Sequence, residues 1–141
     1  VEQKEKFDRV DDSVCAVRSA LQEGIITGGG LALYRAGIEL SYKKFEKTID
    51  EKVAAEILIE AIKVPMEQII INAGKDVEEI IITLNGLSSS YGYDVKNEKI
   101  GDMYKMGIID PLKVTKSALI NAVSVATTIL STNAIITHAR A

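Results

Sequence analysis

Three consecutive glycines, Gly28, Gly29 and Gly30, stand directly before an apolar run that favours a helix. Glycine adopts positive φ without steric cost and lets other groups approach its backbone closely. A helix that begins after such a turn presents free N–H groups and the positive end of its dipole, which suit an anion. A turn or a close packing point between elements would use the same residues. The triplet alone therefore predicts a sharp turn into a helix and leaves its function open.

Patterns that favour helices occur along most of the chain. Apolar residues at steps of three and four predict one long helix over residues 2–23, ended by Gly24. Its narrow apolar stripe, which we expect to pack on one neighbour, consists of Phe7, Val10, Val14, Val17 and Leu21. A second helix is predicted over residues 30–42, followed by a polar loop over 41–47. These signals favour a mostly α-helical domain.

Capping signals place the remaining helices. Thr48 with Glu51, and Asp76 with Glu79, match the capping-box pattern, so helices are predicted from about 48 to 63 and from 76 to near Gly86. Pro65 is expected to end the former and to start a helix over 66–72, closed by Gly74. The isoleucine runs 69–71 and 80–82 are β-branched, but these caps and stops favour helix over strand.

The last third of the chain predicts a small β element and a final helix. Residues 91–94 and 107–109 are short enough to be paired strands, with a charged excursion over 96–105 between them. Asp110 before Pro111 predicts an N-cap and the start of a helix to about Leu130. Because that helix is apolar on most faces, we expect it to be central and buried. Residues 134–137 read as a final strand.

Composition narrows the functional classes. The 141 residues carry a net charge of −3 and are 47% hydrophobic, which suits one modest domain. The acidic balance argues against general nucleic-acid binding. The sequence predicts neither a membrane helix nor a zinc site. Cys15 is the only cysteine, so an internal disulfide is impossible, as is usual in a reducing compartment. The chain lacks an initiator Met, and we expect it to be a fragment of a longer protein.

Several motifs, in their order along the chain, carry a family resemblance. They are Arg9-Val10-Asp11-Asp12-Ser13, the glycine triplet, Tyr91-Gly92-Tyr93-Asp94, and the run from Met106 to Thr115. Together they resemble the group I chaperonins, ring-forming ATPases that fold proteins. The resemblance implies an equatorial-domain-like helical bundle with a small β element. It also implies that residues 1–24 end an intermediate domain and that 25–141 form the C-terminal half of the equatorial ATP-binding domain.

The resemblance implies roles for single residues. Asp12 matches the family's catalytic Asp, which helps to position the water that attacks the γ-phosphate of ATP; an isolated Asp at such a place would otherwise be a solvated surface residue. Gly28 and Gly29 match the Gly-Gly beside the nucleotide and would leave room for ribose and base, whereas Gly30 serves the turn. Asp110 would accept hydrogen bonds from the ribose hydroxyls in addition to capping the helix.

The resemblance also places residues around the base. Ile108 would pack against adenine, or would simply be a core strand residue. Asp94, Val95 and Lys96 stand where the family often has Asn-Ala-Ala. Asn can donate and accept hydrogen bonds, whereas Asp only accepts, so nucleotide discrimination is expected to differ. Tyr91 and Tyr93 are expected to pack across strands rather than to stack on bases.

The cofactor and partner expectations follow from the same resemblance. They comprise ATP, a ring of identical subunits, unfolded client proteins and a co-chaperonin, without nucleic acid or membrane, in the bacterial cytoplasm or the mitochondrial or plastid matrix. The family's Gly-Asp-Gly-Thr-Thr segment and its apical domain are absent from this sequence. Mg²⁺ would therefore be bound mainly by other parts of the parent, no metal ligand is predicted here, and this chain alone is expected to show little ATPase activity. The alternative is a non-enzymatic helical interaction domain with the same fold.

Overall fold

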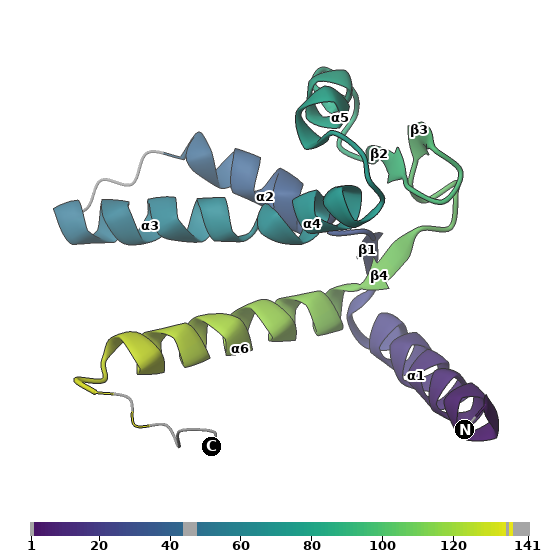
Figure 1. The fold of residues 1–141 in the computed structure, drawn as a ribbon, viewed down its shortest axis with the longest axis horizontal. Helices are drawn as coiled ribbons and strands as arrows, with labels where there is room; N and C mark the ends of the chain where they lie inside the picture. The colour runs from purple at the N-terminus through teal and green to yellow at the C-terminus, as the bar shows by residue number, and fades with distance from the viewer. Residues whose placement is uncertain (1, 44–47, 135, 137–141) are drawn as a thin grey trace, which may run out of the picture. The chain divides into compact units, whose positions relative to one another are not determined.

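A computed structural model describes residues 2–43, 48–134 and 136. These residues form helices and short strands in the following order (Figure 1): α1 (Glu2–Glu23), β1 (Ile25–Thr27), α2 (Leu31–Ser41), α3 (Ile49–Ala61), α4 (Val64–Asn72), α5 (Val77–Leu84), β2 (Tyr91–Asp94), β3 (Lys99–Asp102), β4 (Ile109–Pro111) and α6 (Leu112–Leu130). They divide into a terminal unit, residues 1–24 with 111–141, and a central unit, residues 25–110. The mostly helical fold class is confirmed.

Helix boundaries follow the local signals. Thr48 accepts a hydrogen bond from the N–H of Glu51 at 3.4 Å, and its own N–H donates to the Glu51 carboxylate at 3.1 Å, which completes the predicted capping box. Asp76 accepts from the N–H of Glu79 at 3.1 Å, one of the two bonds of the second predicted box. Both isoleucine runs are helical, as predicted.

The central unit is built on one buried cluster. It consists of Leu31, Tyr34, Met66, Ile70, Ile80, Leu84 and Met103. Gly30 brings the start of α2 close to α4: its φ is +77°, and a Cβ built on it would lie 2.7 Å from the backbone nitrogen of Met66. Real Cβ atoms do not approach so closely, so the turn into α2 requires glycine. The predicted role of Gly30 in the turn is confirmed.

The strand pairing differs from the prediction. β2 pairs antiparallel with β3, with Tyr91 opposite Asp102 and Asp94 opposite Lys99, and β4 pairs with β1. The expected pair of residues 91–94 with 107–109 is therefore wrong, and the charged excursion contains a strand. A four-residue turn lets β3 fold back on β2 at once, and this short loop costs less entropy than a longer connection.

Asp110 is not the N-cap of α6, which corrects the prediction. The capping position belongs to Pro111, with φ −69° and ψ 127°, and Pro111 is also the last residue of β4. Because β4 continues through Asp110 to pair with β1, the extended backbone delays the helix by one residue. The Asp110 carboxylate therefore does not cap α6.

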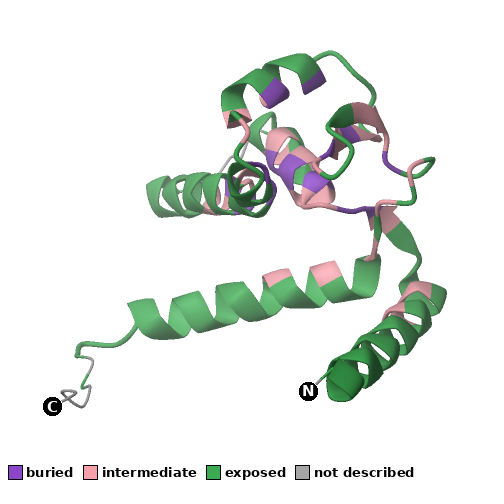
Figure 2. Cartoon of the chain, turned by 45° about the vertical axis from the view of Figure 1, so that its right-hand side comes forward, coloured by how far each residue is buried: buried purple, intermediate pink, exposed green. Residues whose placement is uncertain are grey.

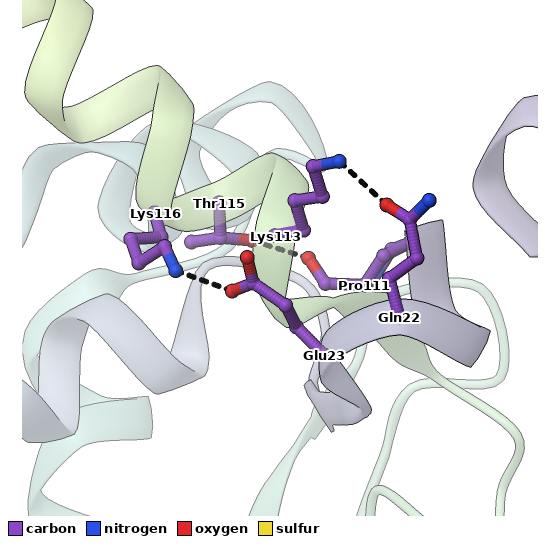
Figure 3. A network of polar contacts seen from close by, with 6 residues as sticks. All are labelled: Gln22, Glu23, Pro111, Lys113, Thr115 and Lys116. Carbon is purple, nitrogen blue, oxygen red and sulfur yellow. Dashed lines mark hydrogen bonds and ion pairs between the residues drawn. The ribbon is translucent and has the colours of Figure 1, made fainter. Parts of the chain in front are cut away.

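In the terminal unit, α1 and α6 are joined where residues 22–24 meet residues 112–116. The Leu112 N–H donates to the Gly24 carbonyl at 3.1 Å. As Figure 3 shows, Lys113 donates to the Gln22 side chain and Lys116 pairs with Glu23. Gly24 ends α1 with φ +89°, as predicted.

The prediction of a buried final helix is wrong for this chain. No residue of α6, all of which are described, is buried (Figure 2), and most of its apolar side chains are exposed. The predicted stripe of α1 is likewise exposed, whereas Ala16, Ser19 and Ala20 on another face are half-buried. The predicted strand over 134–137 includes residues 135 and 137, which lie outside the described residues.

We expect this chain to self-associate at moderate concentration. The exposed apolar side chains of α6 include Ile120, Val123, Ile129 and Leu130, with exposed fractions of 59%, 44%, 53% and 85%. Exposed apolar patches of this kind promote association. Sedimentation velocity across a concentration series measures it, and an Ile129→Ser/Leu130→Ser double variant should shift the distribution toward monomer. A monomer at every concentration, without binding of a hydrophobic dye, would contradict the expectation.

Candidate functional site

A partly open pocket of about 80 Å³ lies within the central unit. Its walls come from the glycine turn, α2, α4, β2 and the segment that leads into β4. The lining residues are Gly29, Leu31, Met66, Ile69, Ile70, Tyr93, Asp94, Val95, Met103 and Ile108. Four residues predicted from the sequence, Gly29, Asp94, Val95 and Ile108, are thus brought together from three distant segments. A mostly apolar wall of this kind suits a flat ring system.

The glycine turn runs beside the residues that precede β4. The Gly28 N–H donates to the Ile108 carbonyl at 2.9 Å, and a Cβ on Gly28 would lie 3.1 Å from the Ile108 carbonyl carbon. Gly28 therefore allows two backbones to approach closely. Gly29, with φ +63°, faces the pocket, where its Cβ would lie 3.5 Å from the terminal methyl carbon of Met103. A side chain at Gly29 would enter the pocket.

Asp94 is a buried carboxylate, 6% exposed, and it accepts hydrogen bonds from the turn that follows it. Its Oδ1 accepts from the N–H groups of Lys96 at 3.0 Å and Asn97 at 3.2 Å. Its Oδ2 accepts from the Asn97 side-chain amide at 2.6 Å. The Asn97 side chain is the main cause that lowers the pKa of Asp94 below its ordinary value. Asp94 is therefore ionised at neutral pH and cannot donate a hydrogen bond.

Asp110 has a different environment. It lies on β4, two residues after Ile108, and is half-buried. Burial raises the pKa of Asp110 above its ordinary value. Within the described part of the chain, no hydrogen bond is recorded to its carboxylate. A partly desolvated carboxylate without a protein donor gains stability from an O–H donor supplied by a ligand.

The remaining predicted residues lie elsewhere. Asp12 is exposed on α1, in the terminal unit, whereas the other predicted site residues belong to the central unit. Lys96 is exposed and lies outside the set of described residues that line the pocket; its backbone N–H serves Asp94. Among the described residues, no group of three or more His, Cys, Asp and Glu side chains is placed to hold a metal ion. No described helix has the length and apolarity to cross a bilayer.

Sequence reasoning missed much of the pocket wall and one polar residue. The apolar lining side chains outside the motifs are Leu31, Met66, Ile69, Ile70 and Met103. Asn97 was also missed, although an Asp followed three residues later by Asn in a polar turn is a signal for side-chain bonding within that turn. The lining of α4 carries no such signal, because helical periodicity does not say which partner an apolar face meets.

Comparison with known proteins gives two findings. A sequence model described as the TCP-1/cpn60 chaperonin family matches residues 1–140. A solved structure, described as a crystal structure of a group III chaperonin in the open state, is similar with 28% sequence identity and a TM-score of 0.74. The match covers 84% of this chain and 25% of that one, so this chain spans about a quarter of the length of the chaperonin it resembles.

Proposed function

The chain belongs to the TCP-1/cpn60 chaperonin family, and we propose that it is the part of an ATP-dependent protein-folding chaperonin subunit that holds the base and ribose of the nucleotide. The predicted chaperonin resemblance and the equatorial-domain-like fold are confirmed. Assignment to group I rather than group III stays a prediction, as does the division into residues 1–24 and 25–141. The observation that carries the proposal is the convergence of Gly29, Asp94, Val95 and Ile108 on one mostly apolar pocket. Asp110 follows Ile108 by two residues in the sequence.

The chemistry assigns a separate task to each part of the site. The apolar wall around Ile108 excludes water and supports the base by contact with its flat face. Asp110 accepts hydrogen bonds from the ribose hydroxyls, which suits an ionised oxygen in a partly desolvated place. Asp12, which lies on α1, orients the attacking water. Mg²⁺ would neutralise charge on the phosphates, and we assign neither the metal nor the phosphates to residues of this chain.

The wider activity is part of the same proposal. Nucleotide binding and hydrolysis would switch the conformation of a ring of identical subunits, and this switching would drive the refolding of unfolded client proteins with a co-chaperonin. The bacterial cytoplasm or the mitochondrial or plastid matrix remains the proposed location.

We expect MgATP to perturb the amide resonances of Gly29, Val95, Ile108 and Asp110 in an NMR titration of this chain. Asp110→Asn should weaken binding about tenfold, because a neutral amide accepts less strongly than a carboxylate. Acid should weaken binding in the same way. The raised pKa of Asp110 means that its protonation begins at a higher pH than for an ordinary Asp, whose value is 3.8. Affinity should therefore fall as the pH drops through this raised pKa.

Two controls make the titration decisive. Asp50→Asn, on an exposed position in the first turn of α3, should leave the affinity unchanged. Inorganic triphosphate, which lacks ribose and base, should not shift the pocket amides. If ATP leaves these four amides unmoved, or moves amides throughout the chain equally, the nucleotide site is wrong and the helical interaction domain becomes the better interpretation.

A further inference from the structure

We infer that the thioether side chain of Met103 sets the size of the base that this pocket accepts, an inference that rests on the nucleotide site proposed above. Met103 lies directly after β3 and is 2% exposed. Three observations carry the inference, namely the backbone hydrogen bonds of Met103, the glycines beside its side chain, and its place in the pocket wall.

The backbone of Met103 is hydrogen-bonded to two other segments of the central unit. Its N–H donates to the Ser90 carbonyl at 2.9 Å, and its carbonyl accepts from the Ile108 N–H at 2.9 Å. The Ile108 carbonyl in turn accepts from the Gly28 N–H, so these bonds continue into the glycine turn. Because both polar backbone groups of Met103 are occupied, the point from which its side chain extends is fixed.

Two glycines leave room for the Met103 side chain. A Cβ built on Gly92 would lie 2.7 Å from the Met103 sulfur and 2.9 Å from its Cγ, distances at which real Cβ atoms are not found. A Cβ built on Gly29 would lie 3.5 Å from the terminal methyl carbon of Met103. The thioether thus extends from Gly92 toward Gly29 and fills space that a side chain at position 92 would take.

Met103 is also part of the pocket wall, beside Gly29 and Ile108. The atoms nearest to a Cβ built on Gly29 are the Met103 methyl carbon and, at 4.0 Å, a methyl carbon of Ile108. The Ile108 side chain is assigned to the flat face of the base, so the Met103 methyl limits the remaining space beside Gly29. A methionine suits this place because its unbranched, polarizable thioether packs closely against an aromatic ring.

The methionines of the complete 141-residue chain allow a direct test without substitution. Met66 and Met103 line the pocket, whereas Met106, in the turn after β3, lies outside its described lining. With isotope-labelled methionine methyl groups, MgATP should shift the Met103 signal and give a nuclear Overhauser contact between that methyl and the protons of the base. The Met106 signal should stay in place. If the pocket amides move but the Met103 methyl shows no contact with the base, the inference is overturned and the nucleotide site stands.

A matched pair of variants, Met103→Ala and Met106→Ala, tests the size limit itself. The ligands are MgATP and two analogues that carry a benzyl group at opposite ends of the base, on its amino group or on C8. At least one analogue should bind the unmodified chain about tenfold more weakly than MgATP, because the pocket has no room for the added group. Met103→Ala should bring that analogue within about threefold of MgATP, and Met106→Ala should leave the ratio of affinities unchanged.

The ratio of affinities separates a size limit from a structural role. A variant that only loosens the fold would weaken MgATP and the analogues alike, so an unchanged ratio in folded Met103→Ala overturns the inference. If Met103→Ala does not fold, the methyl contact in the unmodified chain decides. If MgATP moves none of the pocket amides in the unmodified chain, the proposed function fails and this inference fails with it.

Discussion

Replacing Gly30 by alanine should destabilise the central unit by roughly 3–5 kcal/mol. The φ of Gly30 is +77°, where an L side chain is strained, and the new Cβ would meet the Met66 backbone nitrogen at 2.7 Å and its Cα at 2.9 Å. Backbone atoms of α4 cannot rotate away as a flexible side chain can. The start of α2 must therefore move from α4 or both must shift within the buried cluster. Urea unfolding followed by circular dichroism measures the loss.

Gly74→Ala is the matched control for Gly30→Ala. Gly74 has nearly the same φ, +70°, but a Cβ built there meets no described atom within 4 Å. Its substitution should cost only the strain of the left-handed backbone, about 1–2 kcal/mol. The difference between the two variants isolates the overlap with Met66. Equal losses in the two variants would show that α2 and α4 can separate at little cost.

Asp12→Ala should lower the rate of ATP hydrolysis about 100-fold in a complete subunit that carries this sequence, with little change in nucleotide affinity. Asp12 is proposed to orient the attacking water, so its removal affects the transition state rather than the bound nucleotide. Steady-state phosphate release gives kcat, and an equilibrium titration with labelled ATP gives the affinity.

The neighbouring carboxylate supplies the control for Asp12. Asp11 is also exposed on α1 and carries the same charge, so Asp11→Ala tests whether the general electrostatics of this helix matter. We expect Asp11→Ala to keep most of the activity. Parallel losses of rate and affinity in Asp12→Ala, or equal effects of the two substitutions on rate, would remove Asp12 from the proposed role.

The helices could be predicted from sequence because their signals are local. The capping box of Thr48 and Glu51 and the glycine stop at Gly74 act within a few residues, so no knowledge of distant partners is needed. The strands could not be paired correctly. β1 has three residues, too few to show alternation, and its partner β4 follows it only after residues 28–108. Pairing across such a distance depends on contacts that no local pattern records.

The candidate site, too, was predicted from the sequence only in part. Its motif residues were found through family resemblance, and its apolar wall was not, because Ile69 and Ile70 carry no mark that separates lining from ordinary packing. Asp110 was misassigned as the N-cap of α6 because the Asp-Pro pattern is local. The pairing of β4 with β1, which keeps Asp110 in a strand, is evident only from the fold. Asp94 was found, but its hydrogen bonds to Lys96 and Asn97 became evident only from the conformation of the turn.

The bond between Leu112 and Gly24 has a consequence for the order of folding. It makes the terminal unit a discontinuous domain, into which the whole central unit is inserted as a loop whose two ends meet. Contacts within the central unit join segments that are mostly closer in sequence than α1 and α6. Closing the α1–α6 contact before the insert is compact would cost the entropy of a long loop. The insert should therefore fold first and bring the two outer helices within reach of each other.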